Sequence, residues 1–426
     1  MIWVLISFVV LIVVNVPIAF AIGISGLVFF ITEPNLPINL AIQRFAEGTQ
    51  SFPLLAVPFF VLAGNLLNET GITKRLIDFA NALTGHLVGG LAHVSIILSA
   101  MMGGISGSAN ADAAMQSRIL SPQMMNKGYS GGFTGSVIAF SALITATIPP
   151  SIGLILYGFV GEVSIGQLFM AGIVPGILMT IMLMITSSLI AKKRHYEPAR
   201  IKRATFKEVV STFKASFWGL LFPVILIVGI RFGVFTASEA GAFAVVYALV
   251  VGWFIYKELD WKKLNLVLKN TVEDNAIIML IIACASILGY AITSAQLPQS
   301  ATTFLLSLTE NPFLIITIVL VFLLVAGMFM ESTVNTLLLT PILLPIMTNI
   351  GMDPVHFGIL MMTIVTMGGM TPPIGVTMYT VCSLSNISVT DYMKESIPYI
   401  CMVVVFIIIL VLFPQISLFL PEVLMR

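Results

Sequence analysis

Charged residues are scarce in this chain of 426 residues. Only 9% of the residues are Asp, Glu, Lys or Arg, whereas 58% are hydrophobic, and the mean hydropathy is +1.06. Soluble globular domains do not have this composition. The 20 basic and 19 acidic residues leave a net charge of +1, which gives no electrostatic footprint for nucleic acid. We therefore expect an integral membrane protein that has the lipid bilayer as its partner and binds no nucleic acid.

Cysteine and histidine are also rare. Cys284, Cys382 and Cys401 lie far apart in apolar segments, a distribution that suits neither a disulfide framework nor a metal knuckle. The chain contains no Walker motif, which disfavours a nucleotide-driven pump, and no HExxH, GxSxG or paired-histidine arrangement of a membrane-embedded enzyme. We expect a protein that is not an enzyme and that has no organic cofactor.

Long apolar runs are present instead, among them residues 178–191, 314–330 and 399–413. Such runs approach the roughly 20 residues that a bilayer-spanning helix needs, and no strand-period alternation competes with them. The sequence predicts an all-α, multi-pass membrane protein. The only strongly basic stretch, "KKRHYEPARIKRATFKEVVSTFK" at 192–214, is expected to be a cytoplasmic loop between two halves, 1–191 and 215–426.

The two halves contain matching residues at a nearly constant offset. An offset of 223 pairs identical residues, and after the proline pairs the offset is 222; the pairs are Gly104 and Gly327, Pro122 and Pro345, Pro149 and Pro372, Pro150 and Pro373, and Tyr157 and Tyr379. A double proline and a tyrosine in colinear order indicate duplication rather than chance. We expect two structural repeats.

Each repeat has a proline pair inside an apolar segment, Pro149-Pro150 in the first and Pro372-Pro373 in the second. A helix that carries adjacent prolines must break there. At membrane depth a break is tolerated only where it is buried in protein or lines a polar cavity. Freed carbonyls can ligate a cation, and helix N-termini attract an anion. We expect broken helices at about 130–160 and 354–386, meeting at a transport site near the bilayer midplane.

A polar stretch precedes each proline pair by about forty residues. The stretches are "GGISGSANADAAMQSRILSP" at 103–122 and "GMFMESTVNTLLLTPILLP" at 327–345. They predict re-entrant helical hairpins at about 103–127 and 327–350, with tips that reach the breaks. Asp112 and Glu331 are ionisable residues at membrane depth and so are functional candidates, unless each carboxylate is paired with a backbone amide or a helix cap. Arg118 either faces the substrate, neutralises Asp112 or snorkels to the interface.

Together these residues resemble a known family. "GISGSANADAA", "IPPSIGLILYG" and "GGMTPPIGVTMYT" are similar to segments of the large, DctM-like membrane subunit of tripartite ATP-independent periplasmic (TRAP) transporters, and the resemblance extends over essentially the whole chain. It implies inverted repeats, an elevator-type moving domain and location in the bacterial inner membrane. It also implies sodium-driven import of an organic acid such as sialic acid or a C4-dicarboxylate. The implied partners are a small four-helix membrane subunit and a periplasmic substrate-binding protein.

The resemblance also implies site residues. The coupling ion, Na⁺, is expected at two sites where each hairpin tip meets its break. The first set is Gly104, Ser106, Thr145, Ile148 and Pro149, and the second is Gly327, Gly368, Met370 and Thr371. The substrate anion is expected between the tips, near Ser108, Asn110, Asp112, Arg118, Glu331, Thr333 and Asn335.

Two other functions stay open at this stage. The chain could be an ion channel, or an anion and sodium symporter that works without a binding protein. A duplicated set of broken helices fits alternating access better than a channel does.

Overall fold

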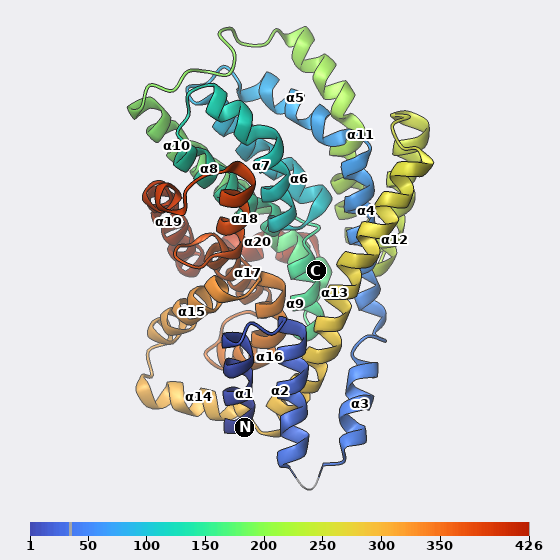
Figure 1. The fold of residues 1–426 in the computed structure, drawn as a ribbon, viewed down its shortest axis with the longest axis vertical. Coiled ribbons are helices and arrows are strands. Elements are labelled where there is room, and N and C mark those ends of the chain that lie inside the picture. The colour runs from blue at the N-terminus through green and yellow to red at the C-terminus, as the bar shows by residue number, and fades with distance from the viewer. Residues whose placement is uncertain (34–35, 426) are drawn as a thin grey trace.

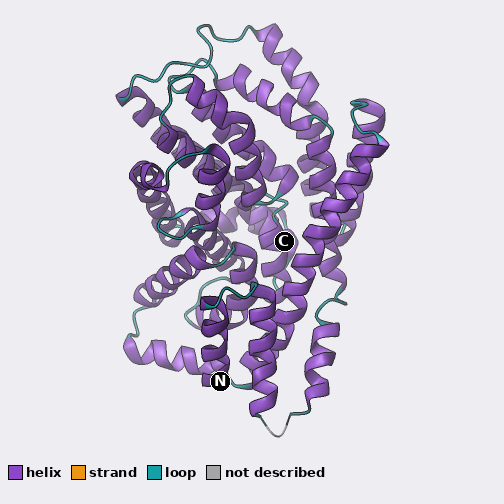
Figure 2. Ribbon diagram, in the orientation of Figure 1, coloured by secondary structure: helices purple, strands orange, loops and turns teal. Residues whose placement is uncertain are grey.

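The computed structural model describes residues 1–33 and 36–425, and within these ranges the secondary structure is helical, without strands (Figure 2). Seven of the described helices are long and apolar enough to cross a membrane, and one bent pair makes an eighth candidate span. The prediction of an all-α, multi-pass fold is confirmed.

The centre of the molecule contains the same succession of helices twice. The first set is α6 (Gly90–Ser106), α7 (Ala109–Asn126), α8 (Gly131–Thr147) and α9 (Ile152–Val160). The second set is α15 (Pro312–Phe329), α16 (Ser332–Asn349), α17 (Pro354–Met370) and α18 (Val376–Ser385). In Figure 1 the hairpin of α6 and α7 lies in the upper half and the hairpin of α15 and α16 in the lower half, so the two hairpins approach the centre from opposite ends.

Both hairpins begin earlier than the sequence indicated. Their first arms start at residues 90 and 312, not at 103 and 327. The polar residues on which the expectation rested occupy only the last turns of each first arm, the tip and the second arm. The earlier turns of α15 are apolar and carry no signal that separates them from an ordinary span.

The first part of each broken helix ends just before the proline pair, and the second part begins after it. Helix α8 ends at Thr147, and α9 restarts at Ile152, with Ser151 as the N-cap that accepts a hydrogen bond from the Leu154 amide. The two parts are bent by 46°. Helix α17 ends at Met370 and α18 begins at Val376. Both Pro-Pro peptide bonds are cis.

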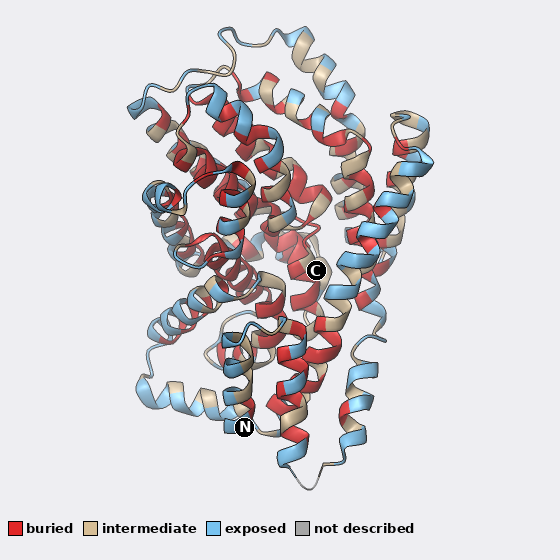
Figure 3. Cartoon of the chain, viewed as in Figure 1, coloured by how far each residue is buried: buried red, intermediate tan, exposed pale blue. Residues whose placement is uncertain are grey.

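The long parts of the broken helices form the core. Residues 132–147 of α8 and 355–370 of α17 are all buried, and the two helices contact each other (Figure 3). The short parts cross to the opposite hairpin, since α9 packs on α16 and α18 packs on α7. At the first break Pro149, Pro150 and Ser151 are buried, so the freed backbone is enclosed by protein. At the second break Thr371 and Gly375 are buried, whereas Pro373 and Ile374 are exposed.

A frame of peripheral helices surrounds one side of this core. The frame includes the 34-residue helix α13 (Trp261–Ser294), which packs on α2 (Ile18–Thr32), α3 (Ile38–Glu47) and α4 (Ala56–Glu69), while α4 also packs on α12 (Ala237–Val250). The remaining helices are α1 (Ile2–Val13), α5 (Ile72–Thr84), α10 (Ile165–Lys193), α11 (Phe206–Arg231), α14 (Leu297–Leu308), α19 (Val389–Leu412) and α20 (Gln415–Leu424).

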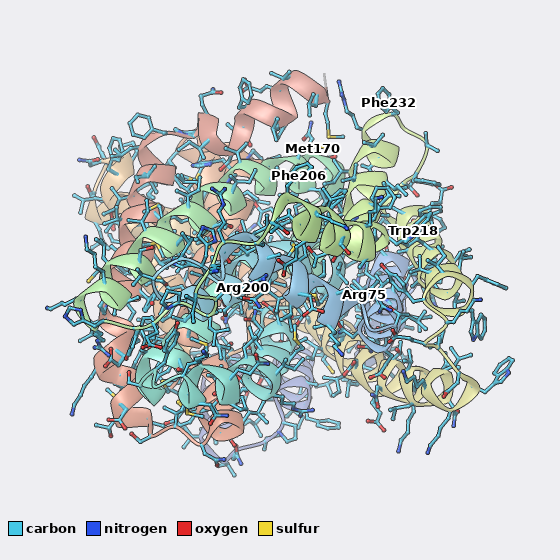
Figure 4. All side chains as sticks on the ribbon, turned by 90° about the horizontal axis from the view of Figure 1, so that it is seen from above. Arg75, Met170, Arg200, Phe206, Trp218 and Phe232 are labelled. Carbon is cyan, nitrogen blue, oxygen red and sulfur yellow. The ribbon has the colours of Figure 1, made fainter. Side chains whose placement is uncertain are left out.

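The basic stretch is a shorter loop than expected. Only residues 194–205 lie outside helices, and 206–214 form the start of α11. Thr205 caps this helix by accepting a hydrogen bond from the Glu208 amide, and Glu208 in the first turn favours the helix start. Arg200 pairs with Glu208 across the loop. Figure 4 views this end of the molecule and shows Arg75 and Arg200 on it.

Two glycines let α15 and α17 approach closely, and this contact can be tested. A Cβ on Gly368 would lie 2.6 Å from the carbonyl carbon of Gly327 and 2.7 Å from the carbonyl oxygen of Leu324. Backbone atoms cannot yield cheaply, so we expect Gly368→Ala to lower the free energy of unfolding by about 1–3 kcal/mol. Thermal unfolding of the purified protein in detergent measures the loss.

Gly289→Ala in α13 is the matched control. A Cβ there would have no atom within 4 Å. Replacing this helical glycine is expected to leave stability unchanged or to raise it by up to about 1 kcal/mol. Equal unfolding temperatures for the two variants would contradict the close packing of α15 on α17.

Candidate functional site

The first hairpin tip touches the first break. Gly107, between α6 and α7, has a left-handed φ of +61°. Its carbonyl accepts a hydrogen bond of 3.4 Å from the amide of Ile152, which follows the proline pair. A Cβ on Gly107 would lie 3.2 Å from the Ser151 Cα and would also meet the Pro150 carbonyl oxygen. Both the conformation and the close approach therefore require glycine at this tip.

The second break gathers backbone oxygens. A Cβ on Gly375 would lie 2.9 Å from the Thr371 carbonyl oxygen and would also meet the carbonyl oxygen of Gly369. The carbonyl oxygen of Gly327 lies 3.9 Å from the Cβ position of Gly369. Three carbonyls, from α15, α17 and the break, thus lie close to Gly369 and Gly375.

The residues expected at the first sodium site are only partly together. Thr145 lies beside the first arm, because its hydroxyl donates to the Ser99 carbonyl at 3.0 Å. Gly103, not Gly104, faces the break: a Cβ on Gly103 would lie 2.9 Å from the Ile148 Cβ, whereas one on Gly104 would lie 2.6 Å from the Pro223 side chain of α11. The repeat offset selected Gly104 because its partner Gly327 is also glycine, and so it missed the neighbour that faces inward.

Ser106 lies at the end of α6, and its backbone packs beside α4. The Ser106 Cα is 3.5 Å from the Cβ position of Gly64. Its hydroxyl donates to the Met102 carbonyl at 3.5 Å. Ser106 is therefore next to the tip, but its described contacts are with the frame and with its own helix rather than with Pro149.

The residues expected at the second sodium site lie together. Gly327 and Gly368 are in direct backbone contact, and the Thr371 hydroxyl donates to the Met367 carbonyl at 2.7 Å. The Met370 carbonyl accepts a hydrogen bond of 2.8 Å from the Tyr392 hydroxyl on α19. The sequence reasoning missed Gly369 and Gly375 as lining positions. The adjacent glycines of "GGM" and the glycine after the proline pair were the available signal.

Asp112 does not face the space between the tips. Its carboxylate is 1% exposed and accepts hydrogen bonds from Ser99 at 2.6 Å, Thr145 at 2.8 Å and the Gln116 amide at 3.0 Å. Gln116 in turn accepts from Ser95 at 2.5 Å. This buried network ties α6, α7 and α8 together and turns Asp112 away from the space between the tips, so that its binding of substrate stays a prediction. The i, i+4 spacing of Ser95 with Ser99 and of Asp112 with Gln116 was the signal for it.

Arg118 and Asn335 also lie away from the space between the tips. Arg118 is exposed on α7, nine residues or about 14 Å along the helix from Ala109, and it has no ion pair with Asp112. Asn335 is fully buried and its side-chain amide donates to the Met330 carbonyl at 2.8 Å and the Ala326 carbonyl at 3.3 Å. Asn335 holds the second tip closed from inside. Neither residue lines the cavity that lies between the tips.

A cavity of about 90 Å³ lies between the two tips. Three helices begin at it, because the N-caps of α7, α9 and α16 all line its wall; these are Ser108, Ser151 and Glu331. Asn110, Ser332 and Thr333 add polar groups, and apolar residues of α13 form the opposite wall. Among the described residues that line the cavity, none carries a positive charge. Helix N-termini are then the positive groups that face it.

The two tips are joined by Asn110. Its side-chain amide donates to the Glu331 carboxylate at 3.1 Å, and its carbonyl oxygen accepts a hydrogen bond from the Thr377 hydroxyl on α18. Within residues 1–33 and 36–425, Glu331 forms no salt bridge. Glu331 is exposed, and its side chain does not cap the helix that it begins.

The Asp112 network supports a prediction about stability. Asp112→Ala would leave the Ser99 hydroxyl without its acceptor, at roughly 1–3 kcal/mol for a buried group that stays unpaired, and would leave a cavity. Thr145 would keep the Ser99 carbonyl as its acceptor, and Gln116 would keep the Ser99 hydroxyl. We expect a clear fall in the unfolding temperature of the purified protein. Arg118→Ala, on the exposed side of the same helix, is expected to change it little. A destabilised Arg118 variant beside an unaffected Asp112 variant would contradict this assignment.

The family model "Tripartite ATP-independent periplasmic transporter, DctM component" matches residues 5–416. The crystal structure of the YdaH transporter of Alcanivorax borkumensis, described as having an unusual topology, is similar in fold. Its TM-score is 0.60 at 12% identity, covering 87% of this chain and 86% of that one.

Two sequence relatives are similar over nearly their whole length. The sialic acid TRAP transporter large permease protein SiaM of Vibrio cholerae is 37% identical, covering 96% of this chain and 95% of the relative. The C4-dicarboxylate TRAP transporter large permease protein DctM of Pseudomonas aeruginosa is 34% identical, covering 94% of each. With its candidate spans, the chain is a multi-pass protein of the bacterial inner membrane. It belongs to the DctM family, the large permease component of the tripartite ATP-independent periplasmic transporters.

Proposed function

We propose that this protein imports an organic acid across the inner membrane, coupled to entry of Na⁺, and that it is not an enzyme. The observation that carries the proposal is the cavity between the tips, on which three helix N-termini converge without a cationic side chain. Such a site favours an anion through oriented amides and helix dipoles. It can release the anion again because no full opposite charge holds it.

The solute is proposed to be a carboxylate. Ser108, Asn110 and Thr333 supply amide and hydroxyl groups that would hydrogen-bond it, together with Ser151 and Ser332, which the sequence reasoning did not include. The relatives SiaM and DctM are named for sialic acid and C4-dicarboxylates, and both solutes carry carboxylate groups. The structural roles of Asp112, Arg118 and Asn335 leave them out of this set.

The coupling ions are proposed to bind at the two breaks. Hard cations prefer oxygen ligands, and unwound helices at membrane depth supply carbonyl oxygens for them. At the second break the carbonyls of Gly327, Gly369 and Thr371 meet these requirements. At the first break the proposed ligands come from Gly103, Thr145 and the Ile148–Pro149 segment.

We propose that the two repeats are inverted relative to each other in the membrane. We also propose that transport follows an elevator mechanism. The core of hairpins and broken helices would slide past the frame that contains α13, carrying the cavity with it. Within the described residues, α5 bridges frame and core, since it follows α4 and packs on α11 and α6. The end that carries the 194–205 loop is proposed to be cytoplasmic because of its basic residues. A small four-helix membrane subunit and a periplasmic binding protein are the proposed partners.

An ion channel is the remaining alternative. The tips meet across Asn110 and enclose a small cavity rather than a continuous pore. This arrangement favours alternating access, in which binding precedes a conformational change.

Uptake by proteoliposomes tests the proposed function. The large subunit is reconstituted with its small subunit and binding protein, with N-acetylneuraminate and succinate as radiolabelled probes. We expect accumulation of at least one probe only when a sodium gradient points inward and binding protein is present. Potassium replaces sodium in the control. Uptake that persists without sodium, or without the binding protein, would refute the coupling.

A single glycine tests the second ion site. A Cβ on Gly369 would lie 3.3 Å from the Thr377 hydroxyl and 3.9 Å from the Gly327 carbonyl oxygen, so it would enter the carbonyl cluster without a severe clash. Gly369→Ala is expected to raise the sodium concentration for half-maximal uptake about tenfold, which corresponds to about 1.4 kcal/mol, with little change in unfolding temperature. Gly289→Ala is again the control. An unchanged sodium requirement in the Gly369 variant would remove this glycine from the site.

A further inference from the structure

A cavity of about 550 Å³ lies between the frame and the second hairpin. On the frame side its walls come from the end of α13 and from α1, which packs on α2. On the other side they come from α15 and α16, and α14 supplies the rest. Helices α1, α14 and α16 lie in the lower half of Figure 1, away from the 194–205 loop. This cavity shares no lining residue with the cavity between the tips.

The walls present apolar stripes at helical spacing. On α14 the lining residues are Leu297, Ala301, Phe304 and Leu305. Their spacing of i, i+4, i+7 and i+8 places them on one face of the helix. Thr303 of the same helix is exposed and does not line the cavity. The other walls contribute only Met, Val, Leu, Ile, Phe and Ala, so no polar side chain lines the cavity within the described part of the chain.

Water does not suit this space. A buried water needs about three polar partners, and the described lining has no polar side chain to offer. An empty space is also unfavourable, because the lining atoms would lose dispersion contacts. An engineered apolar cavity of about 150 Å³ stays dry and binds one benzene, so on that scale a volume of about 550 Å³ holds roughly 20 carbon atoms. The cavity therefore calls for an apolar occupant.

The rim of the cavity is apolar and lies at the protein surface. Leu5, Phe304 and Phe322 line the cavity and are 54%, 63% and 49% exposed. Two of the walls, α13 and α15, are candidate membrane spans. Apolar side chains exposed on such helices face the hydrocarbon of the bilayer. The medium at the mouth is thus lipid.

A transmembrane helix of another subunit does not fit into the cavity. A helix with its side chains is about 10 Å wide, so two turns, about 11 Å long, occupy roughly 850 Å³. The cavity has only about 550 Å³. An acyl chain has no side branches and can enter a space that is too narrow for a helix.

We propose that this cavity binds one acyl chain of a membrane phospholipid, held between the frame and the second hairpin. Close packing against apolar side chains, and not charge, would hold the chain. Its binding does not require the proposed transport function. In the proposed elevator movement, the chain would lie where the second hairpin slides past α13.

Photolabelling of the purified complex of large and small subunits tests the site. The liposomes consist of phosphatidylethanolamine, a small fraction of which carries a diazirine in the middle of one acyl chain. We expect the label, mapped on peptides by mass spectrometry, to concentrate on the lining residues of α14, α15 and α16. Ala301→Trp and Ile342→Phe would fill the cavity from α14 and from α16, so each is expected to reduce this label several-fold. After washing in detergent, each variant is expected to retain one phospholipid fewer than the wild type.

Two control variants match these changes. Thr303→Trp adds the same side chain on an exposed face of α14, and Val246→Phe adds a ring on α12, where Val246 is 58% exposed. Both are expected to keep the wild-type label and the retained lipid. Unfolding temperatures are measured for all four variants. If Ala301→Trp does not fold, Ile342→Phe decides the question by the same measurements.

A crosslinker inside the cavity identifies the occupant directly. Phe304, which lines the cavity, is replaced by p-benzoylphenylalanine, and the complex is irradiated in the same liposomes without the diazirine lipid. An adduct with the mass of a phospholipid would support the site. An adduct with the small subunit would overturn it, because a protein segment would then fill the space.

The outcomes separate this inference from the proposed function. Equal labelling and equal retained lipid in the wild type and in both filling variants would overturn the acyl-chain site, whatever the uptake assays show. Cavity-specific labelling in a wild-type complex that shows no sodium-dependent uptake would overturn the proposed function alone.

Discussion

The structure depends on one constraint, namely that interrupted backbone at membrane depth must be enclosed. The proline pairs remove backbone donors and end α8 and α17 in the middle of the molecule. Lipid could not satisfy the freed groups. The fold meets this constraint by burying α8 and α17 along nearly their whole length and by placing a hairpin near each break. A side chain on Gly107 would meet Pro150 and Ser151 at the first break, and one on Gly327, in the last turn of α15, would meet the backbone of α17.

The same constraint explains how charge is distributed at the centre. In the proposed function, helix starts and ends that would be costly in hydrocarbon bind ions, with amides at the cavity between the tips and carbonyls at the breaks. The cavity between the tips therefore needs no cationic side chain. Its one carboxylate, Glu331, is exposed and accepts a hydrogen bond from the neutral Asn110.

Asp112 and Glu331 show how position decides the role of a carboxylate. Both lie near a hairpin tip and looked equivalent as ionisable residues in an apolar chain. Asp112 points between α6 and α8, where Ser99, Thr145 and Gln116 satisfy it, and so it fastens the hairpin. Glu331 is an N-cap residue whose side chain does not cap its own helix but reaches across to the other hairpin. The first joins three helices of one repeat, and the second joins the two tips.

By itself the sequence determined the membrane class, the two breaks and the position of both tips, because composition, proline chemistry and small polar runs act locally along the chain. It also led to Gly327, Gly368 and Thr371, which lie together at the second break. Only the tertiary structure decided which face each residue presents. Gly103 rather than Gly104 meets the first break, Asn335 points into its hairpin, Arg118 faces outward, and Ser151 and Thr366 line cavities. Those outcomes depend on how helices distant in sequence rotate and pack against one another, and a local pattern does not encode that rotation.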